Sequence, residues 1–292
     1  MITIRIGENT PSLSVLTESA AGRISVNHNP LGWIVYNTLK AVSEIYPSLY
    51  PGNYMIMPDH IHFILAVRDA LPMPLGHYIK IFKEKCSLSW WSRFPDMQDI
   101  SFFSKGFHDR IILDKGQLAR ANAYILDNPR RLWKKRNNPD CFRKLFEVEV
   151  DGETFEAVGN IDLLGNPFIE QVQIHRAEIP AELKEKKKRW INSTLNGGIL
   201  ASPFISEAEK KARDWSLDNG GRIILLEAKP FADRFKPAGR YFDICDEGRL
   251  LILAPKVPYS DIKGRGITRA VSLHLNAKAQ AIAQGRFAIR RK

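Results

Sequence analysis

Tyr54-Met-Ile-Met-Pro-Asp-His-Ile-His-Phe-Ile-Leu-Ala-Val67 is the stretch that decides the fold of the N-terminal half. Apart from Asp59 and two histidines it is apolar and rich in branched residues, which predicts a buried β-strand. Successive strand residues point to opposite faces, so we expect His60 and His62 side by side, with Ile61 and Phe63 in the core. Two imidazoles placed in this way are candidate metal ligands. The alternative is a pair of histidines satisfied by hydrogen bonds within the core.

Two further elements are predicted downstream of this stretch. Residues 106–113 are expected to form another strand, and residues 115–128 a helix. Asp114 can cap the start of that helix, with Gln117 three residues further on. Pro129 either ends the helix or begins a new one.

The predicted helix presents two distinct faces. Leu118, Ala121 and Ile125 recur at helical spacing and are expected to be buried. Tyr124 and Asn128 are four residues apart, so they share a different face. They could meet the two histidines across a sheet, although an ordinary tyrosine on a helix face is the simpler interpretation.

Together these motifs resemble the REP-associated tyrosine transposases, within the insertion-sequence 200-like single-tyrosine HUH class. The resemblance covers about residues 20–137. The matching stretches are Met-Pro-Asp-His-Ile-His-Phe (57–63), Gly-Phe-His-Asp-Arg (106–110) and Tyr-Ile-Leu-Asp-Asn-Pro (124–129). It implies a ferredoxin-like α+β sandwich in which an antiparallel sheet carries the histidines and helices cover one face. Two residues depart from the family pattern. Asp59 replaces an asparagine and adds a negative charge, and His108 replaces an aromatic residue and could bind metal or DNA.

The resemblance also implies a chemistry. Neutral His60 and His62 would bind a divalent cation, Mg or Mn, which acts as a Lewis acid on a scissile phosphate. Asn128 occupies the family's position for a third ligand, and Tyr124 that of the nucleophile. Attack by the tyrosine gives a 5′-phosphotyrosine and a free 3′-hydroxyl, and a second 3′-hydroxyl can reverse the step. The expected protein is a DNA transposase or endonuclease acting on single-stranded or hairpin DNA, as a monomer or homodimer.

The net charge of +11 favours a polyanionic partner. One basic run, residues 130–136, follows the predicted tyrosine helix directly. Trp133 lies within this run and is expected to stack on an unpaired base. The expected phosphate contacts are Arg110, Arg130, Arg131, Lys134, Lys135 and Arg136. The tail from 256 to 292 has nine basic residues and one acidic residue. A solvated surface is the alternative for both clusters, and residues 184–189 are expected to be an ordinary exposed helix.

After residue 140 short apolar strands alternate with helices. The strands are predicted at 146–150, 198–201, 222–227 and 249–254, with a turn at 151–152. The helices are predicted at 206–219, 241–246 and 266–283. The first of these helices should begin with a capping box formed by Ser206 and Glu209. Alternation of this kind predicts a parallel, Rossmann-like sheet.

About residues 155–255 also resemble the Rossmann-like domain of relatives of DNA-processing protein A. The similarity rests on Gly-Gly-Ile-Leu-Ala-Ser-Pro-Phe-Ile-Ser-Glu (197–207) and Glu-Gly-Arg-Leu-Leu-Ile-Leu (247–253). In such sheets ligands bind beyond the carboxyl ends of the strands, where a helix N-terminus attracts phosphate. Ser202 and Ser206 are therefore candidate anion contacts. The sequence has no G-x-G-x-x-G motif and no P-loop, so a purely structural domain is the alternative.

We therefore expect three segments: a nuclease domain (1–140), a Rossmann-like accessory domain (141–256), and a helix with a basic tail (257–292). Two other functions stay open: a domesticated DNA-binding protein with little catalysis, and a nucleotide sensor with a nuclease effector. No run approaches about 18 apolar residues, and the N-terminus lacks a signal-peptide pattern. The three cysteines, Cys86, Cys141 and Cys245, are far apart. Their separation predicts reduced thiols in a cytoplasmic protein. The absence of a long apolar run predicts that the protein has no membrane partner.

Overall fold

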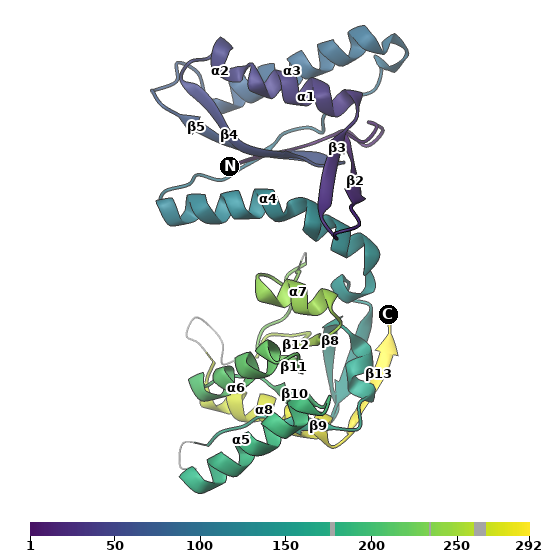
Figure 1. Cartoon of the computed structure of the whole chain (residues 1–292), viewed down its shortest axis with the longest axis vertical. Helices are drawn as coiled ribbons and strands as arrows, with labels where there is room; N and C mark the ends of the chain where they lie inside the picture. Colours follow the sequence, from purple (N-terminus) through teal and green to yellow (C-terminus); the bar gives the residue numbers. More distant parts are fainter. Residues whose placement is uncertain (176–178, 234, 260–266) are drawn as a thin grey trace. The chain divides into compact units, whose positions relative to one another are not determined.

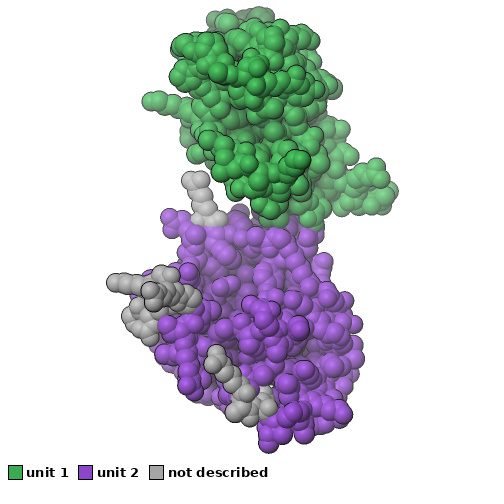
Figure 2. Space-filling model, turned by 90° about the vertical axis from the view of Figure 1, so that its left-hand side faces the viewer, with its two compact units in different colours: residues 1–133 green, residues 134–292 purple. Residues whose placement is uncertain are grey.

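The structure, a computed structural model, describes residues 1–175, 179–233, 235–259 and 267–292. These residues form a mixed α/β protein with two compact units, 1–133 and 134–292 (Figure 2). The boundary lies inside a helix, a few residues before the expected one, and the described part of the C-terminal tail belongs to the second unit. No helix among the described residues has the length and apolar character needed to cross a bilayer.

The first unit is built on an antiparallel sheet with the strand order β4-β5-β1-β6 (Figure 1). Strands β2 and β3 pair only with each other, as a separate hairpin. The elements in chain order are β1 (Ile2–Arg5), β2 (Ser14–Glu18), β3 (Ile24–His28), α1 (Pro30–Lys40), α2 (Val42–Ile45), β4 (Leu49–Ile56), β5 (His60–Val67), α3 (Leu75–Arg93), β6 (His108–Asp109) and α4 (Lys115–Asn137), whose last turn falls in the second unit.

Residues 54–67 form a hairpin and not the single strand that their apolar character suggested. Strand β4 ends at Ile56 and β5 begins at His60, with a turn between them. The turn contains Pro58, which has no backbone N–H to donate to a sheet and so interrupts the run. The second part of the prediction is confirmed. Ile61 and Phe63 of β5 are 1% and 2% exposed and belong to the core.

The two faces of this sheet have different chemistry. Ile4 of β1 and Phe63 of β5 point toward α1 and α3, and they pack with Trp90 and other apolar residues of these helices. Thr3 and His62 alternate with them and point to the opposite face, on which α4 lies (Figure 1). Helices therefore cover both faces, whereas the resemblance implied one.

The strand expected at residues 106–113 is much shorter. Strand β6 contains only His108 and Asp109. It pairs with β1 through Ile2 and Thr3, and Arg110 continues the contact with two hydrogen bonds to the backbone of Met1. The apolar residues that suggested a longer strand are exposed, Ile111 by 74% and Leu113 by 81%.

Helix α4 continues through Pro129 to Asn137, so the proline neither ends the helix nor starts a separate one. The predicted cap is present, because the Gln117 N–H donates to Asp114 Oδ1 at 2.6 Å. The expected buried stripe is only partly right. Ile125 is fully buried but Leu118 is 38% exposed, because the buried residues of α4 are confined to its middle.

The second unit contains a seven-stranded mixed sheet with the order β13-β7-β8-β12-β11-β10-β9. Its elements are β7 (Phe146–Val150), β8 (Glu153–Gly159), β9 (Ile169–Gln171), α5 (Pro180–Leu195), β10 (Ile199–Ser202), α6 (Glu207–Asp218), β11 (Arg222–Leu226), α7 (Arg240–Asp246), β12 (Leu250–Pro255), α8 (Arg269–Ala283) and β13 (Phe287–Arg291). The predicted strands and helices are present to within a few residues. Gly266, the predicted start of the last helix, lies outside the described residues.

Only part of this sheet is parallel. Strands β9 to β12 pair in parallel, as predicted, whereas β8, β7 and β13 continue the sheet in antiparallel order. The turn between β7 and β8 is the predicted one, with Asp151 and Gly152 at φ of 44° and 78°. Helix α8 packs on one face of the sheet through Val271 and Leu275, and α5 to α7 supply Trp190 and Phe242 to the core on the other face.

Candidate active site

His60 and His62 lie on one face of β5, with their ring centroids 4.4 Å apart. His62 is only 6% exposed, whereas the His60 side chain is 17% exposed. Burial, aided by the neighbouring His60, lowers the pKa of His62 to about 4. His62 is therefore neutral at physiological pH, which is the state that a metal ligand requires.

Each imidazole is oriented through its Nδ1 atom. Asp59 Oδ1 lies 2.7 Å from His60 Nδ1, and Thr3 Oγ1 lies 2.8 Å from His62 Nδ1. The hydrogen bond with His60 lowers the pKa of Asp59, so the carboxylate accepts the Nδ1–H and leaves the Nε2 lone pair to a ligand. The same holds for His62 when Thr3 accepts. Oxygen atoms on Nδ1 are the usual outer partners of metal-binding histidines.

Tyr124 lies beside the histidines, because α4 crosses the sheet face on which they stand. Its ring centroid is 5.6 Å from that of His62, and its side chain is 44% exposed. The pocket in front of it has a volume of about 360 Å³. The polar residues that line this pocket include Thr3, His62, Arg110, Arg120 and Tyr124. The expectation that the helix brings the tyrosine to the histidines is confirmed.

Asn128 lies one helical turn after Tyr124, on the buried side of α4. It is 8% exposed, and its Nδ2 has no hydrogen-bond partner among the residues that the structure describes. A buried amide left unpaired costs about 1–3 kcal/mol, so it needs an explanation. A half-turn of the terminal amide group puts its oxygen at the position that Nδ2 now occupies. An amide oxygen is a suitable ligand for a hard cation.

His60, His62 and Asn128 are the candidate donors for a divalent cation. Within the described ranges, no three or more His, Cys, Asp and Glu side chains are grouped so that they could hold a metal ion. A metal here would therefore depend on His60 and His62, on the neutral oxygen of Asn128, and on oxygens of the substrate or solvent. Mixed nitrogen and oxygen ligation with open positions suits Mn or Mg in a nuclease.

Three arginines surround the tyrosine and the histidines. Arg110 and Arg120 line the pocket, and Arg5 pairs with His60 in the register of β1 and β5. Arg5 and Arg120 were not anticipated, although both leave a signal in the sequence. Arg120 is four residues before Tyr124 and so shares its helix face, and Arg5 alternates with apolar residues in a short strand.

His108 is not part of the histidine pair. It is exposed on β6 and pairs with Thr3, whose other neighbour in the sheet is His62. Two strand spacings, about 10 Å, therefore separate the backbones of His108 and His62.

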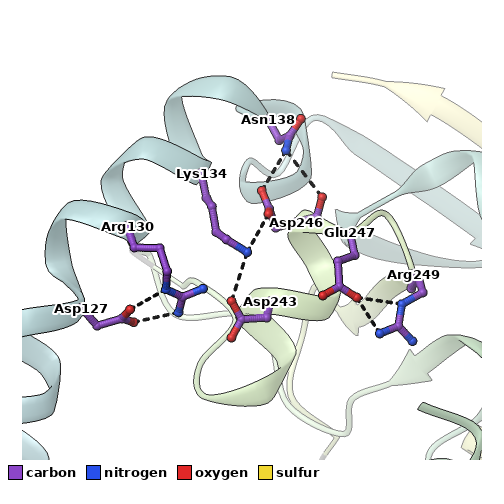
Figure 3. Close-up of polar contacts among 8 residues, drawn as sticks. All are labelled: Asp127, Arg130, Lys134, Asn138, Asp243, Asp246, Glu247 and Arg249. Atoms are coloured by element: carbon purple, nitrogen blue, oxygen red, sulfur yellow. Dashed lines mark hydrogen bonds and ion pairs between the residues drawn. The ribbon is translucent and has the colours of Figure 1, made fainter. Parts of the chain in front are cut away.

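The basic run 130–136 is not the fully open cationic surface that we expected. Arg130 Nε lies 2.6 Å from Asp127 Oδ1. In the second unit, Lys134 Nζ lies 3.2 Å from an oxygen of Asp243 and 2.8 Å from one of Asp246 (Figure 3). The remaining residues differ in exposure: Arg131, Trp133 and Lys135 are half-buried, and Arg136 is exposed. Part of the charge in this run therefore holds the fold together.

The C-terminal tail shows the same behaviour. Arg286 pairs with Asp151 at 2.8 Å, and Arg290 of β13 pairs with Glu149 of β7 at 2.7 Å. Lys256 contacts Glu147 at 2.8 Å. These cations neutralise acidic residues of β7 and of the turn that follows it. Residues 260–266 of the tail lie outside the described residues.

Ser202 and Ser206 are engaged within the second unit. Ser202 is fully buried, and its Oγ accepts the Phe204 N–H at 2.9 Å. Ser206 caps α6 by accepting the Glu209 N–H at 3.2 Å, and the predicted capping box is present. The buried Glu209 carboxylate accepts three further backbone N–H groups around this helix start. The helix N-terminus expected to attract an anion thus already holds the protein's own carboxylate.

The sequence matches no protein-family model and no curated protein. The chemistry open to the site follows from its geometry. An exposed phenol stands beside two imidazoles, and the same helix carries a buried amide with an unpaired Nδ2. Arginines that can receive a phosphate line the pocket in front of the phenol. This set of groups suits nucleophilic attack on a phosphodiester.

Proposed function

We propose that the first unit is a metal-dependent, single-tyrosine DNA endonuclease and strand transferase of the transposase type. The observation that carries the proposal is the position of Tyr124, whose ring centroid is 5.6 Å from that of His62 on the sheet face where His60 and His62 lie together. The arginine-lined pocket in front of the tyrosine supports an anionic substrate. Single-stranded or hairpin DNA is the proposed partner.

In the proposed reaction the Tyr124 hydroxyl loses its proton to solvent and its oxygen bonds to the phosphorus. The bond from phosphorus to the 3′ oxygen breaks, and that oxygen takes up a proton to become a 3′-hydroxyl. The 5′ phosphate stays on the tyrosine. Arg110 and Arg120 are placed to stabilise the charge on the phosphate oxygens. Held by His60, His62 and Asn128, Mg or Mn would supply Lewis-acid polarisation of the phosphate.

The phosphotyrosine keeps the phosphodiester bond energy, so a second 3′-hydroxyl can attack it and release Tyr124. This reversal joins two DNA strands without ATP, which distinguishes a strand transferase from a hydrolytic nuclease. His62 supports either step because its lowered pKa keeps the ring neutral, with a lone pair for a ligand.

We also infer a finer fold assignment for each unit. The sheet of the first unit is built in the chain order β1, α1, β4, β5, α3, β6, which supports a ferredoxin-like relationship. The four parallel strands of the second unit, covered by helices on both faces, support a Rossmann-like accessory domain. The antiparallel strands β7, β8 and β13 extend that domain beyond the usual parallel sheet.

The test is the substitution Tyr124→Phe, assayed for cleavage of labelled single-stranded DNA in the presence of Mn. Cleavage should disappear while non-covalent binding stays close to that of the parent protein, because only one hydroxyl is removed. Tyr50→Phe is the matched control, since Tyr50 is 50% exposed on strand β4 of the same sheet. Cleavage that survives in Tyr124→Phe contradicts the proposal.

A further inference from the structure

A second hollow lies against α4 in the first unit, and we call it the hairpin groove. It has a volume of about 570 Å³ and runs between the β2–β3 hairpin, strand β4 and the second half of α4. The lining residues that bear on its chemistry are Arg23, Val26, His28, Tyr54, Leu126 and Asp127. No local pattern in the sequence predicts this groove, because its walls come from three distant stretches of chain.

The hairpin groove and the tyrosine pocket open on opposite flanks of α4. Each helical residue turns by about 100°, so Leu126 projects about 200° round the axis from Tyr124. The floor of the groove nevertheless begins close to the histidines. Met55 lines the groove and pairs directly with His62 in the register of β4 and β5, about 5 Å away. A DNA strand crossing α4, about 10 Å wide, thus reaches from one site to the other.

The walls of the hairpin groove suit a flat apolar ligand. Leu126 is 59% exposed on one wall, and Val26 of β3 is half-buried on the other. His28 and Tyr54 also line the groove. The centroid of the Tyr36 ring lies 6.1 Å from that of His28 and 5.9 Å from that of Tyr54. Burial lowers the pKa of His28, so it presents a neutral aromatic ring at physiological pH.

Two arginines line the groove beside these apolar walls. Arg23 lies in the turn of the β2–β3 hairpin. Arg130 of α4 also lines the groove and pairs with Asp127, another lining residue, at 2.6 Å. Apolar and aromatic walls between positive charges match an unpaired base with a phosphate on either side of it, because every base has a stackable face and every linkage a negative charge.

We propose that the hairpin groove binds an unpaired base of the single-stranded DNA close to the nucleotide that reacts at Tyr124. This inference rests on the proposed function, since it takes the same strand as its ligand. It adds a base-binding site that acts before any covalent step and that requires neither the Tyr124 hydroxyl nor a metal.

The experiment measures non-covalent binding in a Tyr124→Phe background, by fluorescence anisotropy. The probes are an oligothymidylate and an abasic oligonucleotide with the same number of phosphates. Val26→Trp places a bulky side chain in the groove. Ser25→Trp is the matched control, because Ser25 is the neighbouring residue of β3 and is exposed on the opposite side of that strand. Leu126→Trp fills the groove from an exposed position on α4, where a change is tolerated by the fold.

The background protein should bind the oligothymidylate about ten- to a hundredfold more tightly than the abasic probe, the range expected from stacking. Val26→Trp and Leu126→Trp should lose this preference and keep the affinity for the abasic probe, while Ser25→Trp keeps both. An unchanged preference in both filled variants, or no preference in the background protein, overturns the groove and leaves the nuclease proposal standing. A background protein that binds neither probe overturns both proposals.

Discussion

The sheet face under α4 in the first unit and the carboxyl edge of the parallel strands in the second both gather polar groups, but they use them differently. In the first unit Tyr124 is 44% exposed, and the buried Asn128 amide has an Nδ2 without a partner in the described part of the chain. In the second unit the hydroxyls of Ser202 and Ser206 are hydrogen-bonded internally, and Glu209 fills the start of α6.

This difference separates groups that hold a fold from groups that are available to a ligand. A polar atom whose hydrogen bonds are satisfied internally contributes to stability, and recruiting it for a ligand first costs those bonds. A buried polar atom without a partner costs stability, so its retention points to a role in binding or chemistry. The contrast supports the proposal that the Tyr124 site, and not the start of α6, takes a ligand.

The largest effect is expected from removing either imidazole. His60→Ala and His62→Ala should each abolish metal-dependent cleavage and Mn binding, because the one imidazole that remains cannot hold the ion by itself. Isothermal titration measures the Mn binding. Asn128→Ala should weaken activity less, since water can replace a neutral amide ligand. His77→Ala, on an exposed residue of α3, is the control and should leave both properties unchanged. Full Mn binding in both histidine variants would contradict the assignment.

A smaller effect is expected from the pH dependence of stability in the metal-free protein. The pKa of His62 is about 4 in the folded state and 6.5 when unperturbed. Between these values the unfolded chain binds a proton that the folded protein does not, so stability falls as the pH falls through this window. The loss is at most about 3 kcal/mol. Amide hydrogen exchange of β5 at about pH 7 and about pH 5 measures it, and His62→Gln should remove this share of the pH dependence. An equal pH dependence in both proteins would show that His62 is not held neutral.

The smallest effects distinguish cations that face DNA from cations that hold the fold. Arg120→Gln should reduce the salt dependence of DNA affinity by about one phosphate contact, because Arg120 lines the tyrosine pocket. Lys134→Gln should leave that dependence unchanged but destabilise the second unit by about 1–2 kcal/mol, because Asp243 and Asp246 lose the cation that contacts both of them. Salt titrations and urea unfolding of the two variants measure both quantities. The reverse pattern would restore the basic run as the main DNA contact.

The parts of the site that could be predicted from the sequence depend on local periodicity. Alternation along a strand placed His60 and His62 on one face, and four-residue spacing along a helix placed Tyr124 and Asn128 on another. The capping box of Ser206 and Glu209 and the turn at Asp151 were equally local. In each case the residues that decide the geometry are within a few positions of one another, so no tertiary information was needed.

The parts that could not be predicted depend on pairing between distant segments. The short strand β6 depends on its pairing with β1, and the mixed character of the second sheet depends on β13 meeting β7. The contacts of Lys134 with Asp243 and Asp246 also join residues far apart in the chain. Charge counted along the sequence therefore overestimates the basic surface without acidic partners, because those partners come from other elements.

The most direct test of the central claim is to identify the atom that carries DNA after reaction. The parent protein is incubated with labelled single-stranded DNA and Mn, denatured and digested, and the DNA-linked peptide is identified by mass spectrometry. We expect a 5′ phosphate on Tyr124, formed only when the metal is present. A linkage to any other residue, or cleavage that leaves no covalent adduct, would contradict it.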